Sequence, residues 1–390
     1  MPVPLQVAVV GGGLFGAATA RYLAEAGHEV TIVASPEPGD PTYSTAARVG
    51  AGPMASHYDQ GRIVRSGGSG LGAASVQRYH GLADRSGIPF FRSHPVVVLT
   101  AKTASESESD SPRRPARSIG AEPADVRAVG LQELAASTGI VAPAGFEGVV
   151  LVETSTAGIV NPRMLVQAQL TLARAAGAEL VADHAAGVDL GATPDRVRVV
   201  TASGTPTEAD QLVLATGAYG AELIDLHLPI QRRLRTVALI EIEGPADKLP
   251  SLSADGFLHP ADSADPKLEE MYWVPPVEYP DGGVYLKIGG NSLPMITASD
   301  SGDIGRWFQA GGSAAEAEAL YALACDLLPQ RRLRLVGHKP CVVSYTDDEQ
   351  PVIERVDDRV VLALGGNGSG ATTGDEVGRQ AAELVDESGG

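Results

Sequence analysis

The amino-acid sequence predicts a mixed α/β (α+β) protein of two domains, the first of which opens on a parallel sheet. Residues 5–34 follow the order strand, glycine-rich turn, helix and strand. Strand and helix patterns then alternate along the chain without a repeat of fixed period. With 390 residues and 44% hydrophobic residues, the chain is long and apolar enough for two or three structural units with buried cores.

The sequence of the N-terminal half predicts the following elements, in chain order. Residues 5–10 form a short apolar run typical of a buried parallel strand, residues 14–26 form an Ala- and Leu-rich helix, and residues 29–34 form a second strand. Residues 35–68 lack periodicity, which predicts a long functional loop. A helix over 70–85, a strand over 94–101 and a polar surface insertion over 104–118 follow.

The remaining chain predicts a second strand–helix–strand unit, over 148–153, 161–176 and 179–182. Asn161 suits the cap and Pro162 the first position of its helix. Further strands are expected over 196–202, 211–214, 236–242, 284–288, 342–345 and 359–364, and further helices over 314–328 and 371–385.

The charge balance argues against several partners. Thirty Lys and Arg residues against 48 Asp and Glu residues give a formal net charge of −18. Nucleic-acid binding needs a basic face, as does docking on anionic membranes. Residues 1–4 carry no basic leader, no apolar run is long enough to span a bilayer, and two cysteines cannot form a disulfide framework. We expect a cytoplasmic monomer.

The first chemical motif is Gly11-x-Gly13-x-x-Gly16, placed between a strand and a helix. Glycine at these positions lets backbone N–H groups approach a pyrophosphate at the positive end of the helix. A tight turn without a ligand is the alternative, and the strand that follows at the proper distance favours the nucleotide site.

The acid that normally holds the ribose at the end of the second strand is missing, because Ala34 and Ser35 stand there. Ser35 or Glu37 is a candidate replacement. The missing acid weakens the case for NAD more than for FAD, since FAD is held along its whole length.

Further segments resemble the FAD-dependent D-amino acid oxidase (DAO) superfamily, particularly its monomeric sarcosine oxidase and N-methyltryptophan oxidase branch. They are residues 59–65, 161–162, 215–218, 286–289, 341–354 and 365–370. The resemblance implies a Rossmann-like FAD-binding domain (1–68, 148–228 and 335–390). This domain would be interrupted by a substrate domain with a mostly antiparallel sheet (69–147 and 229–334).

Cys341 matches the cysteine to which that branch attaches the flavin through a thioether, so the resemblance implies covalent FAD. A buried structural cysteine, as we expect for Cys325, is the alternative.

Lys287 lies in an otherwise apolar strand, where an ammonium is costly to bury without a partner. It matches a family lysine that sits over the flavin and promotes reaction with oxygen, which implies a catalytic role. The alternative is an outward-facing lysine on an edge strand.

Arg62 and Arg65 match two family arginines, of which the second grips a substrate carboxylate and the first lies near the flavin ring. The alternative is a pair of surface arginines. The chain departs from the branch at two positions, where Thr372 replaces a carboxylate-binding lysine and Asn291 replaces a histidine. Substrate identity is therefore left open.

The C-terminal glycine turn and the helix that follows should direct a positive helix end at the flavin. Together with the first turn, the resemblance assigns cofactor contacts to Gly11, Gly13, Leu14, Phe15, Gly16, Ser35, Ser44, Arg62, Thr216, Gly217, Cys341, Gly366, Asn367, Gly368, Ser369, Gly370 and Thr372.

Tyr272 and Trp273 fall where the family places an aromatic residue on the substrate side, and core packing is the equally weighted alternative. Arg65 and Asn291 complete the expected substrate contacts. No spacing of His, Cys, Asp and Glu suggests a metal site.

These observations predict an oxidase that uses FAD and molecular oxygen to oxidise the C–N bond of an amine or amino acid, preferably a secondary amine, with release of hydrogen peroxide. The alternatives are a dehydrogenase that uses another acceptor, an NAD(P)-binding Rossmann protein, and a flavin-binding scaffold without catalysis.

Overall fold

The computed structural model describes residues 4–36, 53–66, 70–101, 126–142, 146, 148–154, 157–193, 195–246, 248–255 and 267–387. The expected surface insertion at 104–118 lies outside these residues, as do Glu37 and Ser44. None of the described helices is long and apolar enough to cross a lipid bilayer.

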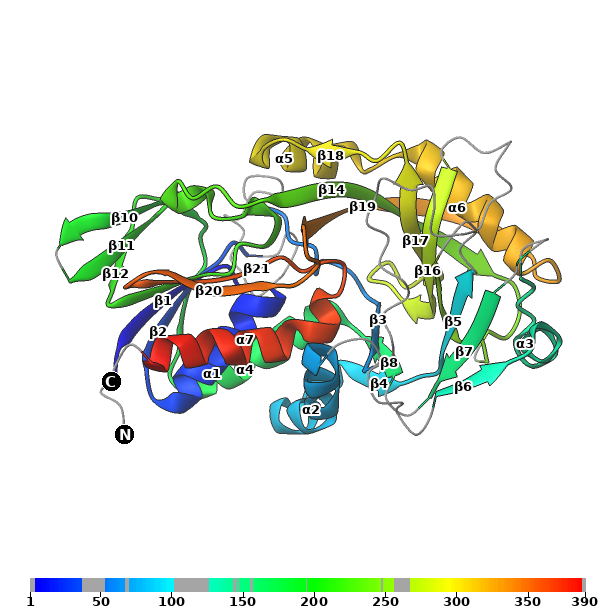
Figure 1. Cartoon of the computed structure of the whole chain (residues 1–390), viewed down its shortest axis with the longest axis horizontal. Coiled ribbons are helices and arrows are strands. Elements are labelled where there is room, and N and C mark those ends of the chain that lie inside the picture. Colours follow the sequence, from blue (N-terminus) through cyan, green and yellow to red (C-terminus); the bar gives the residue numbers. More distant parts are fainter. Residues whose placement is uncertain are drawn as a thin grey trace.

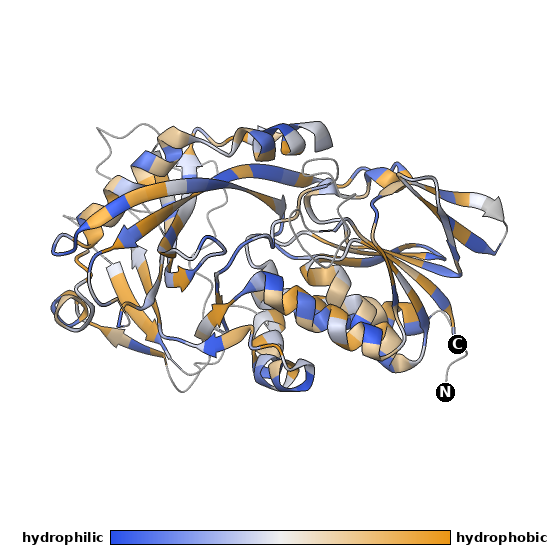
Figure 2. Ribbon diagram, turned by 180° about the vertical axis from the view of Figure 1, so that it is seen from behind, coloured by the Kyte–Doolittle hydropathy of each residue, from blue (hydrophilic) through white to orange (hydrophobic). Residues whose placement is uncertain are grey.

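A six-stranded sheet forms one end of the molecule (Figure 1). Its strands pair in parallel except for β20 at one edge. The order across the sheet is β20 (Val352–Asp357), β21 (Val360–Leu364), β13 (Gln211–Leu214), β1 (Gln6–Val10), β2 (Glu29–Val33) and β9 (Glu179–Val181). These strands are mostly hydrophobic (Figure 2), as expected for a sheet that is covered on both faces.

Three helices cover one face of this sheet: α1 (Leu14–Ala26), α4 (Pro162–Ala175) and α7 (Gly370–Asp386). The other face packs against a three-stranded sheet formed by β10 (Ala185–Thr193), β11 (Arg196–Thr201) and β12 (Pro206–Ala209). Asn161 caps α4 as predicted, because its side chain accepts the N–H groups of Arg163 and Met164.

A buried ionic cluster joins the helices. The Asp375 carboxylate, on α7, lies 2.8 Å from Arg21 of α1 and 2.6 Å from Arg78 of α2 (Gly70–Ser86). Gln169 of α4 donates to the same carboxylate at 2.9 Å. Arg21 and Asp375 are almost completely buried, so the ion pairs and hydrogen bonds of this cluster must offset the cost of removing both charges from water.

We expect Asp375→Asn to lower the free energy of unfolding by about 3–5 kcal/mol, because it deprives the buried Arg21 guanidinium of its buried carboxylate and leaves it only the more exposed Glu25 among the described ion pairs. Urea unfolding of the apoprotein measures this change. Glu383→Gln is the matched control: Glu383 pairs with Arg379 on the same helix but is 55% exposed, so the loss should stay below about 1 kcal/mol. Equal losses in the two variants would contradict the prediction.

The second large unit is a nine-stranded sheet, which is antiparallel except for the pair β15–β5 among the described pairings. Its order is β18 (Thr297–Ala298), β14 (Ile230–Ile242), β17 (Val284–Leu293), β16 (Lys267–Glu278), β15 (Ser251–Asp255), β5 (Val96–Ala101), β7 (Gly148–Glu153) and β6 (Val126–Val129), and β19 (Leu333–Thr346) pairs with β14. Helix α6 (Ala314–Leu327) packs against this sheet and completes the largest apolar core.

The strands around residue 150 differ from the prediction. β7 pairs with β5 and β6 in the nine-stranded sheet, so residues 148–182 do not form a strand–helix–strand unit. The strand that leads into α4 is β8 (Ala157–Val160), which pairs with β3 (Arg62–Arg65) and β4 (Phe91–Ser93). This arrangement could not be predicted from the sequence, because β7 and β8 lie close together in the chain but pair with distant strands.

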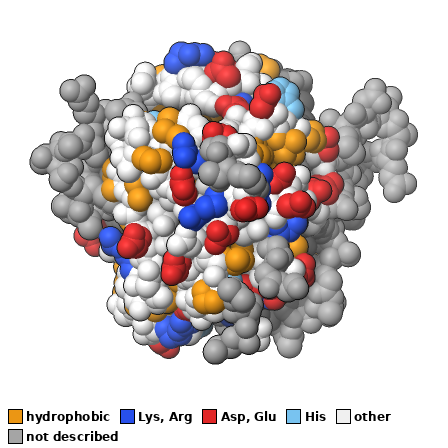
Figure 3. Space-filling view, turned by 90° about the vertical axis from the view of Figure 1, so that its left-hand side faces the viewer, with side chains coloured by type: hydrophobic (Ala, Val, Ile, Leu, Met, Phe, Trp, Pro, Cys, Tyr) orange, Lys and Arg blue, Asp and Glu red, His pale blue; other side chains and the backbone are white. Residues whose placement is uncertain are grey.

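The predicted fold class is confirmed: a Rossmann-like parallel sheet is combined with a mostly antiparallel one. The pairings of β7 and β19 place parts of 148–153 and 335–346 in the nine-stranded sheet, not in the parallel unit. Two short helices were not predicted, α3 (Leu131–Thr138) and α5 (Ser301–Ala310), and the short 3₁₀ turns η1 (Gly217–Tyr219) and η2 (Glu222–Ile224) follow β13. Acidic side chains are interspersed with basic ones on the face in Figure 3, so the negative charge there is spread out.

Candidate active site

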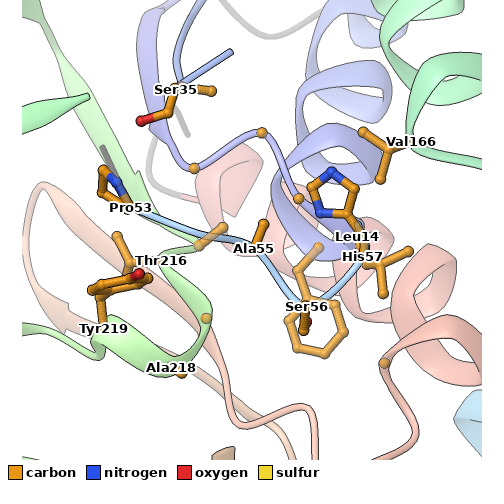
Figure 4. A pocket seen from close by; sticks show the side chains of 18 of the residues that line it. Leu14, Ser35, Pro53, Ala55, Ser56, His57, Val166, Thr216, Ala218 and Tyr219 are labelled. Carbon is orange, nitrogen blue, oxygen red and sulfur yellow. The ribbon is translucent and has the colours of Figure 1, made fainter. Parts of the chain in front are cut away.

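A cavity of about 980 Å³ opens at the carboxyl ends of β1, β2, β13 and β21. This edge of a parallel sheet is where α/β folds bind ligands. Residues 53–58 cross the cavity between the start of α1 and the segment Thr216–Tyr219 (Figure 4). Of the residues predicted to bind cofactor, those lining the cavity are Gly11, Gly13, Leu14, Phe15, Ser35, Arg62, Thr216, Gly217, Cys341, Gly366, Gly368 and Gly370.

The glycines of the first turn have different roles. Gly11 has φ of 104°, and a Cβ there would lie 2.3 Å from the carbonyl oxygen of Ala215. A Cβ on Gly16 would lie 1.8 Å from the oxygen of Gly11, so Gly16 serves the packing of the turn and does not line the cavity. At Gly13 the nearest atom would be Nδ1 of His57, at 3.7 Å. Gly13 also leaves the start of α1 without a side-chain cap, which exposes N–H groups to the cavity.

We expect Gly16→Ala to lower the free energy of unfolding of the apoprotein by about 1–3 kcal/mol, because the new methyl group would overlap a backbone oxygen. Gly13→Ala places the same methyl group at an ordinary van der Waals distance, 3.7 Å from Nδ1 of His57, and should cost less than about 1 kcal/mol. Urea unfolding of both variants measures the difference, and a larger loss for Gly13→Ala would refute this account of the turn.

The C-terminal turn presents backbone to the cavity at Gly366, Gly368 and Gly370. Asn367 has φ of 45°, and its side-chain oxygen accepts the N–H of Thr346 at 2.9 Å, so this side chain braces the turn and is not on the cavity wall. Ser369 and Thr372 are likewise not on the wall, although Ser369 caps α7 without a side-chain hydrogen bond. The bare end of α7 therefore opens toward the cavity, as predicted from the sequence.

At the end of β2, where the ribose-binding acid was expected, the cavity is lined by the hydroxyl of Ser35. Ser35 lines it beside Ala34, and the buried Ser35 Oγ has no hydrogen-bond partner in the described part of the chain. The neighbouring wall is formed by α4, whose polar side chains Arg163, Gln167, Thr171 and Arg174 line the cavity.

His57 and Arg163 are cavity residues that the sequence did not reveal. Burial, and then the charges of Arg163 and Arg62, lower the pKa of His57 to about 3, so the imidazole is neutral at pH 7. Two guanidinium groups near the start of α1 make this part of the cavity favourable for an anion. Only a pattern of cavity-facing positions on α4 could have indicated Arg163.

Lys287 is fully buried on β17, an interior strand between β14 and β16, so the outward-facing alternative is wrong. Its Nζ lies 2.9 Å from Oδ2 of Asp59 and also donates to the carbonyl oxygen of Gly61. The Tyr272 ring centroid is 5.5 Å from Nζ, which adds a cation–π contact.

Asp59 is the buried partner that the sequence left unidentified. Its Oδ1 accepts the hydroxyl of Tyr279 at 2.9 Å, and its Oδ2 accepts from Arg62 as well as Lys287. The charges of Lys287, Arg62 and Lys339 outweigh burial and hold the pKa of Asp59 well below its usual value. The position of an acid three residues before Arg62 was the available signal.

Cys341 lies on β19 and lines the cavity, close enough to Arg62 and Lys287 to interact with their charges. Arg62 also lines the cavity, whereas Lys287 does not. Arg235, which faces Cys341 across the β14–β19 pairing, is 6% exposed, and its Nη2 has no hydrogen-bond partner among the described residues.

None of the four predicted substrate contacts is among the described residues that line the cavity. Arg65 is at the far end of β3 from Arg62, and Asn291 donates to Glu270 on the neighbouring strand. Trp273 is completely buried in the core of the nine-stranded sheet and donates to the oxygen of Pro250 at 2.8 Å, so the core-packing interpretation holds for it. Tyr272, on the opposite face of β16, remains beside Lys287 and Arg62.

The described residues contain no group of three His, Cys, Asp or Glu side chains that could hold a metal ion.

Comparison with known structures shows the same fold in several oxidases. NikD, described as an unusual amino acid oxidase essential for nikkomycin biosynthesis, has a TM-score of 0.73 at 18% identity, over 98% of this chain and 94% of that one. Iminodiacetate oxidase from Chelativorans sp. BNC1 has a TM-score of 0.66 at 17% identity, over 97% and 95%. The deglycating enzyme fructosamine oxidase from Aspergillus fumigatus (Amadoriase II) has a TM-score of 0.72 at 15% identity, over 99% and 87%.

No curated protein matches the chain in a sequence search. The sequence model of the DAO family, described as FAD dependent oxidoreductase, matches residues 6–384 and so spans both sheets and the cavity between them. The chain therefore belongs to the DAO family of FAD-dependent oxidoreductases.

Proposed function

We propose that this protein is an oxidase that removes a hydride from the carbon beside the nitrogen of an amine or amino acid, preferably a secondary amine, and passes the electrons to oxygen. The net reaction converts R₂CH–NHR′ and O₂ into R₂C=NR′ and H₂O₂. The buried ammonium of Lys287, next to cavity residues Arg62 and Cys341, is the observation that carries the proposal. A positive charge at this place favours the negative charge that oxygen gains when it is reduced.

The cavity fits FAD on three observations. Glycines keep the backbone open at both turns, the starts of α1 and α7 lack side-chain caps, and the buried Ser35 hydroxyl has no partner among the described residues. The residues that would hold FAD are Gly11, Gly13, Leu14, Phe15, Ser35, Arg62, Thr216, Gly217, Cys341, Gly366, Gly368 and Gly370. When bound, FAD accepts the hydride and returns the electrons to oxygen.

The residues of the chain would hold the cofactor in place and provide positive charge around it. The N–H groups at the start of α1 suit a pyrophosphate, and those at the start of α7 suit an anionic edge. Arg62 stays charged because Asp59 raises the pKa of its guanidinium against the effect of burial. No general base is required, since the neutral amine is the reactive form.

We propose a thioether between Cys341 and FAD, in which a C–S bond would replace the thiol S–H bond and one C–H bond of the flavin, and the two electrons released would pass through the flavin to oxygen. Its support is the position of the thiol on the cavity wall beside the cationic groups Arg62 and Lys287. Cysteine sulfur is a strong intrinsic nucleophile, so a thiol on this wall suits bond formation to a cofactor bound in the cavity.

The function is tested by mixing the protein, without oxygen, with secondary amines that do or do not carry a carboxylate, and then admitting oxygen. We expect bleaching of the flavin absorbance by the amine, followed by recovery and one peroxide per turnover. Bleaching without recovery would show a dehydrogenase instead. The carboxylate of Asp59 favours that alternative, because it offsets the charge of Lys287. Absence of bleaching with every amine would reject both functions.

A further inference from the structure

One carboxylate, Asp59, lies among several cationic side chains behind the cavity wall. It is 3% exposed. Its two oxygens accept four hydrogen bonds, from Lys287, Arg62, the Tyr279 hydroxyl and the N–H of Gln60. A carboxylate this deeply buried and so fully bonded is expensive to remove from water unless it has a specific task.

We infer that Asp59 is a positioning residue that keeps the Lys287 ammonium protonated and fixed beside Arg62 and Cys341, and thereby sets the pH range in which Lys287 supports oxygen reduction. This inference rests on the proposed oxidase function for its last step only.

The geometry shows how Lys287 is fixed. An ammonium has three N–H donors, and the described contacts use two of them, on Asp59 and on the oxygen of Gly61. Both acceptors belong to the short segment that leads into β3, whereas Lys287 comes from β17. The two hydrogen bonds therefore join the nine-stranded sheet to the segment that carries Arg62, and they leave one donor of the ammonium unused.

The charges show why Asp59 is needed. Burial and the charge of Arg62 lower the pKa of Lys287 to about 8, and the charge and hydrogen bond of Asp59 oppose this fall. Of the other charged or titratable groups in this cluster, Tyr272 of β16 and Cys341 of β19 interact with Lys287 itself. Tyr279, which follows β16, and Lys339 of β19 interact with Asp59, and Arg235 of β14 interacts with Tyr272. Asp59 is the carboxylate in direct contact with Lys287, so its loss leaves mainly cationic neighbours.

Asp59→Asn separates charge from shape, because the amide oxygen can still accept a hydrogen bond from Lys287. We compare it with Lys287→Met, with the double variant and with Asp59→Glu, which keeps the charge. Asp281→Asn is the matched control: Asp281 also accepts a tyrosine hydroxyl, from Tyr285 at 3.0 Å, but lies exposed at the turn before β17. Reoxidation of the amine-reduced holoenzyme is followed from pH 6 to pH 10 (a range of about four units around the value for Lys287).

We expect Asp59→Asn to move the fall in reoxidation rate to lower pH and to slow the reaction at pH 8 about fivefold or more, since loss of an adjacent opposite charge shifts a pKa by about 1–3 units. Asp59→Glu should retain most of the rate, and Asp281→Asn all of it. In the Lys287→Met background the further change to Asn should have no effect on the rate. A purely structural Asp59 would lower the rate equally in both backgrounds and leave the pH profile in place, which would overturn the inference.

Unfolding of the four apoproteins in urea provides a reading that does not depend on catalysis. We expect Asp59→Asn to destabilise the protein more when Lys287 is present than in the Lys287→Met background, because Arg62 loses its carboxylate partner in both backgrounds, whereas Lys287 loses its partner only in the first. Equal losses in both backgrounds would overturn the inference. If the wild-type protein does not react with oxygen, the oxidase proposal fails, and this unfolding cycle still decides whether Asp59 and Lys287 are coupled.

Discussion

Replacing Lys287 by methionine is expected to slow the reaction of the reduced protein with oxygen by about 100- to 1,000-fold, the range found when one preorganised electrostatic group is removed. Reduction by the amine should change little, because hydride transfer does not require this charge. The fully buried methylene chain of Lys287 is matched in volume by methionine, so the core should not collapse.

The pH dependence of the oxygen reaction in the wild-type protein is a second test of the role of Lys287. The ammonium is protonated below its pKa of about 8 and loses its charge as the pH rises through that value. Oxygen reactivity should therefore be constant at low pH and decline above about pH 8. In Lys287→Met this decline should vanish.

Stopped-flow absorbance of the flavin separates the two half-reactions. Lys248→Met is the matched control, since the same substitution at an exposed lysine should alter neither half-reaction. An unchanged oxygen reaction in Lys287→Met, or a loss confined to reduction by the amine, would remove Lys287 from the oxidative step.

Cys341→Ser is expected to abolish covalent attachment of the cofactor. The denatured wild-type protein should carry the added mass of FAD and remain yellow after acid precipitation, whereas the serine variant should show the mass of the polypeptide alone. Serine preserves the size of the side chain on β19 but is a far weaker nucleophile than a thiolate.

Cys325→Ser controls for this experiment, because Cys325 lies on α6, away from the cavity wall, and should leave the adduct intact. Intact-mass spectrometry gives a yes-or-no answer for each variant. An unmodified wild-type mass would reject the thioether while leaving noncovalent FAD in place, and an adduct that disappears with Cys325→Ser would show that the attachment is not on β19.

Local signals were sufficient to predict the two glycine-rich turns at the cavity. Gly11, Gly16 and Gly368 were predicted because backbone geometry at a turn constrains the residue type, and the structure shows positive φ or close backbone contact there. Lys287 was noticed for a related reason, since a charge in an apolar strand requires a partner.

The partners themselves could not be predicted, because pairing across distant strands leaves no mark in a short window of sequence. Asp59 lies 228 positions from Lys287, and β7 looks like a strand of the parallel unit until its neighbours β5 and β6 are known. Neighbouring residues on one strand can also face different environments: Trp273 faces the core, while Tyr272 faces the cationic cluster.

The long ribbon formed by β14 and β19 has a mechanical consequence. The two strands pair from Ile230 and Thr346, beside the C-terminal glycine turn, to Ile242 and Leu333, near the far end of the molecule (Figure 1). The pairing has one register shift, between Leu239 and Ile240, and is otherwise regular, so the ribbon offers little of the backbone freedom that a hinge requires. The two sheets should therefore move as one body, and substrates should gain entry through rearrangement of the loops and side chains around the cavity, without a clamshell motion of the domains.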